Sequence, residues 1–408
     1  MFGNWRVPKE LLDLEPITRE TCGIFYGREN EITKLKKFVS DSNVVLIEGE
    51  AGVGKTSLGN YVRFTADESL TPLSEIKCQP TWQNFNFLIE LQSHIIGEIF
   101  REGSRFHGLQ HNEIVKTIYN RNKTQEFRSI NASFGIIGGG FSTSISQQAV
   151  ISEASLFEEL RELVSIVKNN TELPNPIIVQ VNNLDLDAVF NEEELSKFLN
   201  CIRDALQIKG INFILIGTEG IFALIKSKVK RLQQILSTTI TIDSFSLDEL
   251  LNVLNKRMAN SKYSGNKLPL DRDLMELIYN HSSGSTREVM NEIRELLLAF
   301  QNEPLMESIT VKDASDYYAK ESVRMLQKVI NNNKNIADII KIIKQSPGIT
   351  QKEIVEKVSI KQGTVSGIVN KLIDSDVLIR SILGTATMYR VRTKYELALN
   401  SINLDSFF

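Results

Sequence analysis

A nine-residue stretch near the N-terminus limits what this 408-residue chain can fold into. Residues 49–57 have the sequence Gly-Glu-Ala-Gly-Val-Gly-Lys-Thr-Ser, which fits the phosphate-binding pattern GxxxxGK[ST]. An apolar run at 44–47 precedes it and a helix-compatible run at 57–62 follows it, as the pattern requires. The chain is therefore expected to contain a strand, a glycine-rich loop and a helix that together bind a nucleoside triphosphate.

Each part of this loop has an expected chemical role. Glycines let the backbone curl so that successive N–H groups point at phosphate oxygens, and the helix N-terminus adds partial positive charge. We expect Lys55 to reach the β- and γ-phosphates of ATP and the Thr56 hydroxyl to bind Mg²⁺. The predicted nucleotide-binding residues of the loop are Gly49, Glu50, Ala51, Gly52, Val53, Gly54, Lys55, Thr56 and Ser57.

The composition is that of an ordinary globular protein. The length predicts two or three domains, and a net charge of −3 argues against a molecule that binds polyanions over its whole surface. The three cysteines are far apart and have no metal-ligand spacing. No apolar run approaches the ~20 residues that cross a bilayer. We expect a soluble, cytoplasmic protein with no membrane partner.

A turn with the sequence Tyr-Gly-Arg-Glu at 26–29 precedes the P-loop and opens a segment with helical spacing of apolar residues. This arrangement resembles the box II motif of AAA+ ATPases, particularly of the origin-recognition and archaeal-initiator branch and of the related STAND NTPases. In that family the segment packs on the adenine. The resemblance therefore implies that Tyr26, Gly27 and Arg28 lie near the base.

The strand expected at 177–181 leads into Asn-Asn-Leu-Asp at 182–185, the Walker B position of the family. An acid at this strand tip normally holds the water shell of Mg²⁺, and the next acid polarises the attacking water. Many relatives have Asp-Asp-Leu-Asp, whereas Asn182 and Asn183 carry no charge and cannot act as bases. Either Asp185 or another acid such as Glu219 substitutes, or ATP acts mainly as a ligand. We favour slow turnover, with Asp185 binding Mg²⁺ through water.

Three further positions extend the resemblance. Thr218, at the end of the strand expected at 213–216, is the sensor 1 candidate for the γ-phosphate or the attacking water. Arg231 is the candidate arginine finger, which would stabilise transition-state charge in a neighbouring subunit. Arg287 follows a small-residue turn and resembles sensor 2, which would contact the γ-phosphate and couple the lid to the nucleotide. The alternatives are a polar strand end, a solvated basic face and an ordinary capped helix, respectively.

A second module is expected at 331–400. Three helices, the third beginning near residue 361, precede two alternating strands, and this order resembles a winged-helix domain. The module carries eleven Lys and Arg against six Asp and Glu, a charge of about +5, which leaves about −8 for the rest of the chain. That asymmetry favours contact with the phosphates of double-stranded DNA.

The third helix of a helix-turn-helix domain enters the DNA major groove. The predicted DNA-binding residues are Lys361, Gln362, Thr364, Ser366, Asn370 and Lys371 on this helix and Arg380, Arg390 and Arg392 on the wing. The alternative is a winged helix that contacts protein or inhibits the chain, as in several STAND proteins.

The resemblance covers most of the chain and leaves residues 103–150 without a counterpart. Glycines at 138–140 between apolar residues predict a β-hairpin there. His107 and His111 are four residues apart but lack the third ligand that a metal site needs. The expected architecture is a parallel-sheet α/β P-loop domain of the AAA+ type at 1–243, a helical lid at 244–330, a winged helix at 331–400 and a tail at 401–408.

Two functions fit this architecture. The first is an ATP-binding, slowly hydrolysing molecular switch that couples nucleotide state to DNA binding, of the kind used in initiation, transposition or anti-phage defence. The second is a STAND-like, ATP-dependent oligomeric sensor or scaffold that acts through protein partners. Because no nuclease or protease constellation is visible in the sequence, we expect a homo-oligomer or a partner protein that carries an effector.

Overall fold

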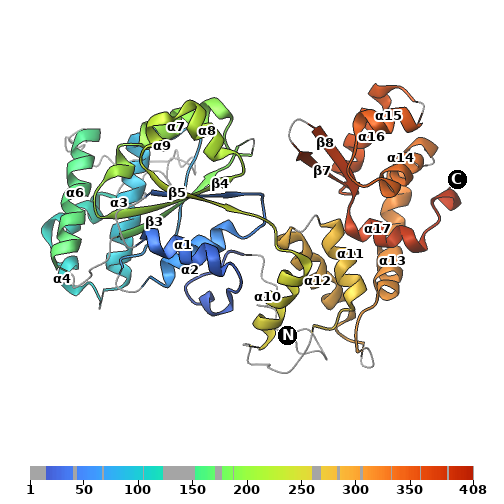
Figure 1. Ribbon diagram of the computed structural model, residues 1–408, viewed down its shortest axis with the longest axis horizontal. Helices are drawn as coiled ribbons and strands as arrows, with labels where there is room; N and C mark the ends of the chain where they lie inside the picture. Colours follow the sequence, from blue (N-terminus) through green and yellow to red (C-terminus); the bar gives the residue numbers. More distant parts are fainter. Residues whose placement is uncertain are drawn as a thin grey trace, which may run out of the picture. The chain divides into compact units, whose positions relative to one another are not determined.

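The computed structural model divides the chain into two compact units, Glu15–Asp243 and a C-terminal unit that begins at Ser244. Figure 1 shows the helices and strands of both. The residues that the structure describes are 15–39, 44–66, 69–103, 105–122, 152–170, 177–186, 188–259, 268–282, 285–303, 307–331, 333–358, 360–383 and 386–407. None of the helices in these ranges is long and apolar enough to cross a lipid bilayer.

The N-terminal unit is built on a parallel sheet with the strand order β2-β3-β4-β1-β5. Its strands are β1 (Val44–Gly49), β2 (Ile76–Lys77), β3 (Ile177–Leu184), β4 (Ile211–Thr218) and β5 (Leu236–Ile242). Parallel strands that are covered on both faces tend to be continuous apolar runs, and β1 is buried along its whole length. Because parallel strands bring their carboxyl ends to one edge, Gly49, Asp185 and Thr218 meet at that edge.

Helices cover both faces of this sheet (Figure 1). One face packs on α1 (Glu29–Val39) and α2 (Lys55–Phe64) through a core that includes Leu35, Leu58 and Ile47. The other face packs on a larger helical layer. The helices with residues in that layer are α3 (Asn84–Arg101), α4 (His107–Gln110), α6 (Glu153–Asn170), α7 (Glu192–Ile202), α8 (Ile221–Lys228) and α9 (Lys230–Gln233). Short 3-10 turns lie at Cys22–Ile24 and Ala205–Gln207.

The first part of the segment 103–150 is helical. Residues 107–110 form α4 and residues 113–122 are also helical. The glycine-rich hairpin predicted around 138–140 lies outside the described residues. Within the described ranges, no group of three or more His, Cys, Asp or Glu side chains could hold a metal ion.

The first part of the C-terminal unit is helical, as the lid prediction requires. Its helices share one apolar core and are α10 (Leu247–Ala259), α11 (Arg272–His281), α12 (Thr286–Phe300) and α13 (Val311–Ile330). The predicted cap of α10 is present: the Ser246 N–H donates to the Glu249 carboxylate at 2.8 Å, and the Glu249 N–H donates to Ser246 Oγ at 3.3 Å.

The second part has the order of a winged helix. Three helices come first, α14 (Lys334–Gln345), α15 (Gln351–Val358) and α16 (Gln362–Asp374). The hairpin β7 (Leu378–Leu383) and β8 (Ala386–Val391) follows, and β6 (Ile349–Thr350) pairs with β8. The sheet is antiparallel with the order β6-β8-β7, and α16 takes the place of the recognition helix.

A further helix, α17 (Thr393–Ser401), is not part of the sequence-based expectation. Leu397 and Ala398 on α17 are buried in the lid core, whereas Leu404, in the 3-10 turn Leu404–Phe407, is buried in the winged-helix core. In turn, Leu326 and Ile330 of α13 belong to the winged-helix core. Lid and winged helix are therefore interlocked, and the segment predicted as a tail packs on the winged helix.

Candidate functional site

The loop between β1 and α2 has the backbone that its glycines predict. Gly52 and Gly54 have φ angles of 84° and 97°, in the left-handed region that favours glycine. At Gly49 an added Cβ would lie 2.3 Å from the carbonyl oxygen of Ile242, so β5 passes too close for any side chain. These constraints fix a curled loop at the N-terminus of α2, which is the geometry that directs loop N–H groups toward phosphate.

Lys55 is the charged centre of this loop. Its side chain is buried, and Nζ donates to the carbonyl oxygens of Gly49 at 2.8 Å and Glu50 at 2.6 Å. The ammonium group therefore lies inside the curl of the loop, where a P-loop lysine meets phosphate oxygens. Thr56 is half-buried beside it, whereas the hydroxyl of Ser57 accepts from the Ile17 N–H at 3.4 Å.

The predicted base-binding turn contacts the P-loop. Gly27 and Arg28 both have positive φ angles, 81° and 67°. Arg28 Nη2 lies 3.5 Å from the carbonyl oxygen of Val53, to which it donates, and it also donates to the carbonyl oxygen of Asp243 at the end of β5. Arg28 thus connects the N-terminal turn, the P-loop and the last residue of the unit. Contact of Tyr26, Gly27 and Arg28 with an adenine stays a prediction.

Strand β3 runs to Leu184, so the two asparagines lie inside the strand and not beyond it. Asn182 is 6% exposed, and its Oδ1 accepts from Gln180 Nε2 at 3.0 Å. Asn183 is half-buried and has a φ angle of 66°. The amide oxygen of Asn182 is therefore already hydrogen-bonded within the strand, and the backbone of β3 departs from regular geometry at Asn183.

Asp185 lies close to the P-loop lysine. Burial raises the pKa of the Asp185 carboxyl above its ordinary value, and the positive charge of Lys55 partly offsets this. Thr218 lies next to Gly49 in the sheet, and its Oγ1 accepts from the Leu186 N–H at 3.0 Å. The fold thus brings Lys55, Asp185 and Thr218 together at one edge, as the sequence predicts.

The remaining acid and base candidates of this unit are more exposed. Glu219 has an exposed side chain, and its N–H donates to the Gly49 carbonyl at 3.1 Å. Arg231 is exposed on α9, at the surface, as an arginine finger requires. Its role toward a neighbouring subunit stays a prediction.

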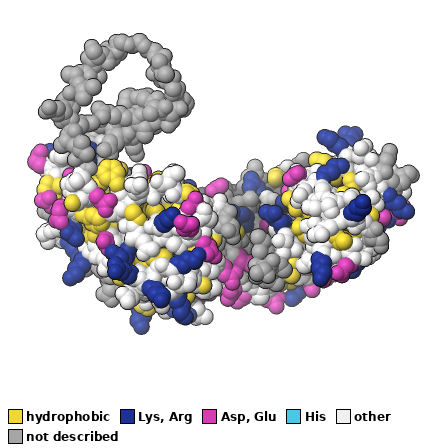
Figure 2. All heavy atoms as spheres, turned by 90° about the horizontal axis from the view of Figure 1, so that it is seen from above, with side chains coloured by type: hydrophobic (Ala, Val, Ile, Leu, Met, Phe, Trp, Pro, Cys, Tyr) yellow, Lys and Arg dark blue, Asp and Glu magenta, His cyan; other side chains and the backbone are white. Residues whose placement is uncertain are grey.

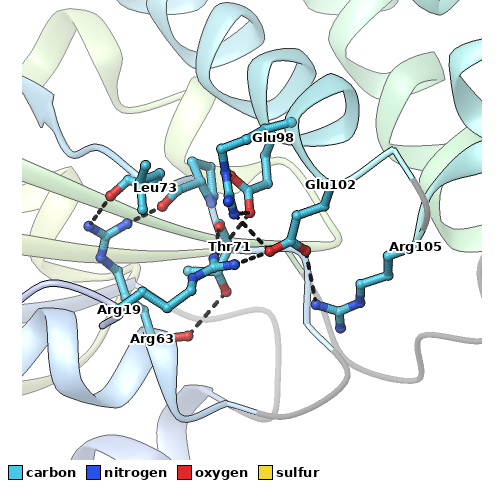
Figure 3. Close-up of polar contacts among 9 residues, drawn as sticks. Arg19, Arg63, Thr71, Leu73, Glu98, Glu102 and Arg105 are labelled. Atoms are coloured by element: carbon cyan, nitrogen blue, oxygen red, sulfur yellow. Dashed lines mark hydrogen bonds and ion pairs between the residues drawn. The ribbon is translucent and has the colours of Figure 1, made fainter. Parts of the chain in front are cut away.

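Sequence reasoning missed a buried arginine that anchors the P-loop helix (Figure 3). Arg63, near the end of α2, is 1% exposed, and its guanidinium donates to Asn60 Oδ1 at 3.0 Å and to the Leu73 carbonyl at 3.0 Å. It also pairs with Glu75 at 3.2 Å. Burial lowers the pKa of Arg63 to about 10, and the charge of Glu75 partly offsets this.

A second arginine joins the N-terminal segment to the same region. Arg19 donates to the Thr71 carbonyl at 2.9 Å and pairs with Glu98 of α3 at 3.0 Å. Glu98 is also paired with Arg101 at 2.6 Å. Figure 3 shows these groups around the loop that follows α2. These hydrogen bonds and ion pairs hold the C-terminal end of α2, the helix whose N-terminus follows the P-loop.

The donors at the sheet edge fit a magnesium nucleotide. The loop supplies backbone N–H groups and a buried ammonium group, which suit phosphate oxygens. A threonine hydroxyl and a carboxylate are oxygen ligands of the kind that Mg²⁺ prefers. Thr56 and Asp185 are the residues of this chain that supply them.

The lid candidate lies at the start of α12. Arg287 is the second residue of this helix and is exposed. The turn before it includes Ser283 and Gly284, which lie outside the described residues. Contact of Arg287 with a nucleotide stays a prediction.

Several of the predicted DNA-binding residues are exposed on α16, and their contact with DNA stays a prediction. Lys361 caps the helix, and Lys361, Gln362 and Thr364 are exposed on its first turn. Ser366 is half-buried and Asn370 is exposed. On β7, Arg380 is exposed as well. Figure 2 shows Lys and Arg side chains on the surface of the winged-helix part, at the right of the view.

Three other predicted DNA contacts have partners inside the C-terminal unit. Lys371 Nζ donates to the Val329 carbonyl at 2.6 Å, near the C-terminus of α13, where a positive charge is favourable. Arg390 Nη1 donates to the His281 carbonyl at 3.2 Å. Arg392 pairs with Asp376 at 2.6 Å. These three side chains therefore already have partners within the C-terminal unit, and their contact with DNA stays a prediction.

Comparison with known proteins gives one family match. Residues 333–379 match the family model described as winged helix-turn-helix DNA-binding. That match covers α14 to the start of β7. None of the curated proteins is significantly similar to the chain in sequence.

Solved structures give low-identity matches over the whole length. The ORC1 protein of Aeropyrum pernix in complex with DNA has a TM-score of 0.46 and 13% identity, with 98% of this chain and 96% of that chain covered. The Walker-type ATPase PABY2304 of Pyrococcus abyssi has a TM-score of 0.44 and 15% identity, with 96% and 100% covered. CDC6p from Pyrobaculum aerophilum has a TM-score of 0.41 and 15% identity, with 98% of each chain covered.

The assignment of the fold rests on the chain's own geometry. A P-loop after β1, a parallel sheet with β1 between β4 and β5, and a helical region that leads into a matched winged helix are all present. The chain has an AAA+ P-loop fold with a C-terminal winged helix. The fold class expected from the sequence is confirmed.

Proposed function

We propose that this protein is an ATP-binding, slowly hydrolysing molecular switch that couples its nucleotide state to the binding of duplex DNA. The observation that carries the proposal is the meeting of Lys55 and Asp185 at the carboxyl edge of the sheet. A buried ammonium group inside a glycine loop, with a carboxylate beside it, is the charge pattern that a magnesium nucleotide requires.

On the nucleotide side, each residue has one role. Lys55 and the loop amides would bind the phosphates, and Thr56 and Asp185 would hold Mg²⁺. When bound, Mg²⁺ neutralises the charge that develops on the phosphates. Thr218 lies beside this site through its contact with the Leu186 N–H and orients the attacking water.

Slow turnover follows from the residue types next to Asp185. The residue after it is Leu186, whose side chain cannot polarise water, and Asn182 and Asn183 cannot accept a proton. The site therefore retains phosphate and metal binding and lacks a neighbouring base. Such a site favours a long-lived ATP state over rapid hydrolysis.

On the DNA side, the first turn of α16 is the contact surface. Lys361, Gln362 and Thr364 are exposed there, and Arg380 on β7 is exposed beside the wing. The third helix of a helix-turn-helix domain reads the major groove, and basic residues around it bind phosphate. The charge of about +5 on residues 331–400 supports this role.

A second candidate function is a scaffold that acts through protein partners. It is favoured by the contacts of Lys371, Arg390 and Arg392, which occupy three of the predicted phosphate ligands with partners inside the C-terminal unit. In that case the exposed Arg231 would contact a neighbouring copy and ATP would hold an oligomer together.

Phosphate release with and without duplex DNA, beside a Lys55→Ala control, separates these functions. The switch predicts slow release that changes when DNA is added, and DNA binding that weakens steeply with salt. The scaffold predicts ATP-dependent oligomers and no effect of DNA. No DNA binding at low salt would contradict the switch.

A further inference from the structure

Strand β3 contains one residue more than its neighbour β4 near the carboxyl edge of the sheet. The two strands pair one to one up to Val181 and Leu215, and the next pair is Leu184 and Gly217. Three steps along β3 therefore match two along β4, which is a β-bulge. Asn183 lies in this bulge with a φ of 66°, in the left-handed region that asparagine adopts more readily than most residues.

The bulge changes which face of the sheet the next side chains occupy. Side chains of a regular strand alternate, so residues three apart lie on opposite faces. Val181 and Leu184 are three apart, yet both are buried in the core on the face away from α2. Gln180 lies on the α2 face, since a Cβ added at Gly59 would be 2.4 Å from its Oε1. Asp185, next to Leu184, is therefore turned to the α2 face, where the P-loop lies.

Hydrogen bonds hold the backbone at this acid and just after it. The Leu186 N–H donates to Thr218 Oγ1 at 3.0 Å. The N–H groups of Val189 and Phe190 donate to the Asp185 carbonyl at 3.1 and 3.0 Å. If β3 were regular through Asn183, with no bulge, alternation would place Asp185 on the opposite face of the sheet, with Val181.

We propose that Asn183 is a positioning residue whose left-handed backbone places the Asp185 carboxylate where a P-loop NTPase carries the acid that is missing at residue 182. This inference rests on the proposed nucleotide binding and explains how the same site keeps a carboxylate for Mg²⁺. The role belongs to the backbone angle of Asn183 and not to its side chain. Glycine can therefore replace it, whereas a β-branched residue cannot.

The test compares Asn183→Gly, Asn183→Val and Asp185→Asn in the full chain. The affinity for a fluorescent ATP analogue is measured with and without Mg²⁺, alongside phosphate release. We expect Asn183→Gly to stay within about twofold of wild type. Asn183→Val and Asp185→Asn should lose the magnesium-dependent part of the affinity, about tenfold, while the affinity without Mg²⁺ is unchanged.

Thermal melting of each variant guards against unfolding, and Asn183→Ala is the milder substitution if Asn183→Val melts early. A variant Asn183→Val or Asp185→Asn that melts like wild type and keeps its full magnesium dependence would overturn the inference. If wild type binds no nucleotide, or if Lys55→Ala binds it equally well, the proposed function fails instead.

A second inference concerns the wing and rests on contacts that all lie in the C-terminal unit. Arg390 Nη1 on β8 donates to the carbonyl oxygen of His281, the last residue of α11, at 3.2 Å. Nδ1 of the same histidine lies 2.7 Å from Glu396 Oε2 on α17. The wing and α17 therefore both hold the end of α11.

One carboxylate pairs with a wing arginine, and the pKa of a second responds to the charge of both arginines. Arg392 pairs with Asp376 at 2.6 Å. Glu288 on α12 is half-buried; burial raises the pKa of its carboxyl, and the charges of Arg392 and Arg390 partly offset this. The printed contacts hold Arg390 at the His281 carbonyl and Arg392 at the Asp376 carboxylate.

We infer that contacts inside the C-terminal unit compete with duplex DNA for Arg390 and Arg392. A guanidinium group binds phosphate as it binds carboxylate, so DNA can take these arginines only when their contacts with His281 and Asp376 open. The inference rests on the proposed DNA binding and identifies the contacts that oppose it.

The test weakens the contacts that hold the two arginines and leaves the arginines themselves in place. Asp376→Asn combined with Glu396→Gln removes the carboxylate that pairs with Arg392 and the one that pairs with His281, and keeps side-chain shape. Binding to a labelled duplex should become about tenfold tighter, with a salt slope steeper by about one to two, because the arginines then bind phosphate. The matched control, Asp273→Asn with Glu276→Gln, changes the charge equally at exposed positions of α11 and should shift the affinity less than about threefold.

The double variant Arg390→Gln with Arg392→Gln completes a mutant cycle, in which the same two arginines are removed with and without the opening substitutions. In the opened background this pair should remove the whole gain, and in the otherwise wild-type chain it should cost less than about threefold. Equal cost in both backgrounds, or no gain on opening, would overturn the inference. Failure of every variant to bind DNA would overturn the proposed DNA binding itself.

Discussion

The two candidate sites differ in how the fold places the residues that the sequence singles out. At the sheet edge, Lys55, Asp185 and Thr218 come from distant parts of the sequence and meet. In the winged helix, the predicted residues separate into an exposed set on the first turn of α16 and a set that contacts the lid, such as Arg390. The carboxyl ends of parallel strands lie at one edge of the sheet, however far apart the strands are in the sequence. The side chains of a hairpin, by contrast, take directions that depend on the elements packed against it.

The largest expected effect tests the predicted nucleotide site at the sheet edge, where residues distant in the sequence meet. Replacing Lys55 by alanine removes a buried ammonium group from the phosphate position, and ATP affinity should fall by about 100-fold or more. Isothermal titration with ATP and Mg²⁺ measures this. Lys34→Ala, at an exposed lysine on α1, is the control and should bind ATP like wild type. Equal affinity of Lys55→Ala and wild type would show that the P-loop is not the nucleotide site.

The next effect tests the stability of the C-terminal unit, in which lid and winged helix are packed together. Burial raises the pKa of Glu292 to about 7; Glu295 acts in the same direction, and the Tyr318 hydroxyl, which donates to Glu292 at 3.1 Å, opposes it. The folded state thus binds a proton that the unfolded state releases above pH 4.5. The stability from this group is present below pH 4.5 and is lost as the pH rises through 7.

Glu292→Gln should abolish most of that pH dependence. At pH 8 it should stabilise the C-terminal unit by up to about 3 kcal/mol, since one pKa unit is worth about 1.4 kcal/mol. Denaturant unfolding of the full chain at pH 5 and pH 8 measures the change. Glu276→Gln, at an exposed position of α11, should leave the curve as in wild type. A wild-type chain that becomes more stable between pH 5 and pH 8 through this residue would contradict the assignment.

A smaller effect separates the two sets of winged-helix residues directly. Lys361→Gln with Arg380→Gln should weaken duplex binding by about tenfold and reduce the salt slope by about two, because both side chains are exposed. Lys371→Gln should change the binding less than about twofold, since its Nζ is held by the Val329 carbonyl. Fluorescence anisotropy over a range of salt concentrations distinguishes them. A large loss for Lys371→Gln would show that the inward contact opens when DNA binds.

The sequence could predict the parts of the fold that follow from local pattern. The glycine loop at 49–57, the apolar strands and the order of helices and strands in the winged helix all came from spacing and residue type. The register of neighbouring strands does not follow from spacing, so the bulge at Asn183 was beyond prediction. Long-range packing is likewise invisible, which is why α17 and the burial of Arg63 among carbonyl groups were missed.

The smallest expected effect concerns Asn182, which stands where many relatives of the AAA+ type have an aspartate. Asn182→Asp restores the residue type that the Walker B position normally carries. Its Oδ1 accepts from Gln180 Nε2 at 3.0 Å, and an aspartate oxygen can accept the same hydrogen bond. Because the bulge already presents Asp185 to the P-loop, phosphate release should stay within about twofold of wild type. A rise of about tenfold would mean that a carboxylate at 182 is what turnover lacks, and that Asp185 does not take its place.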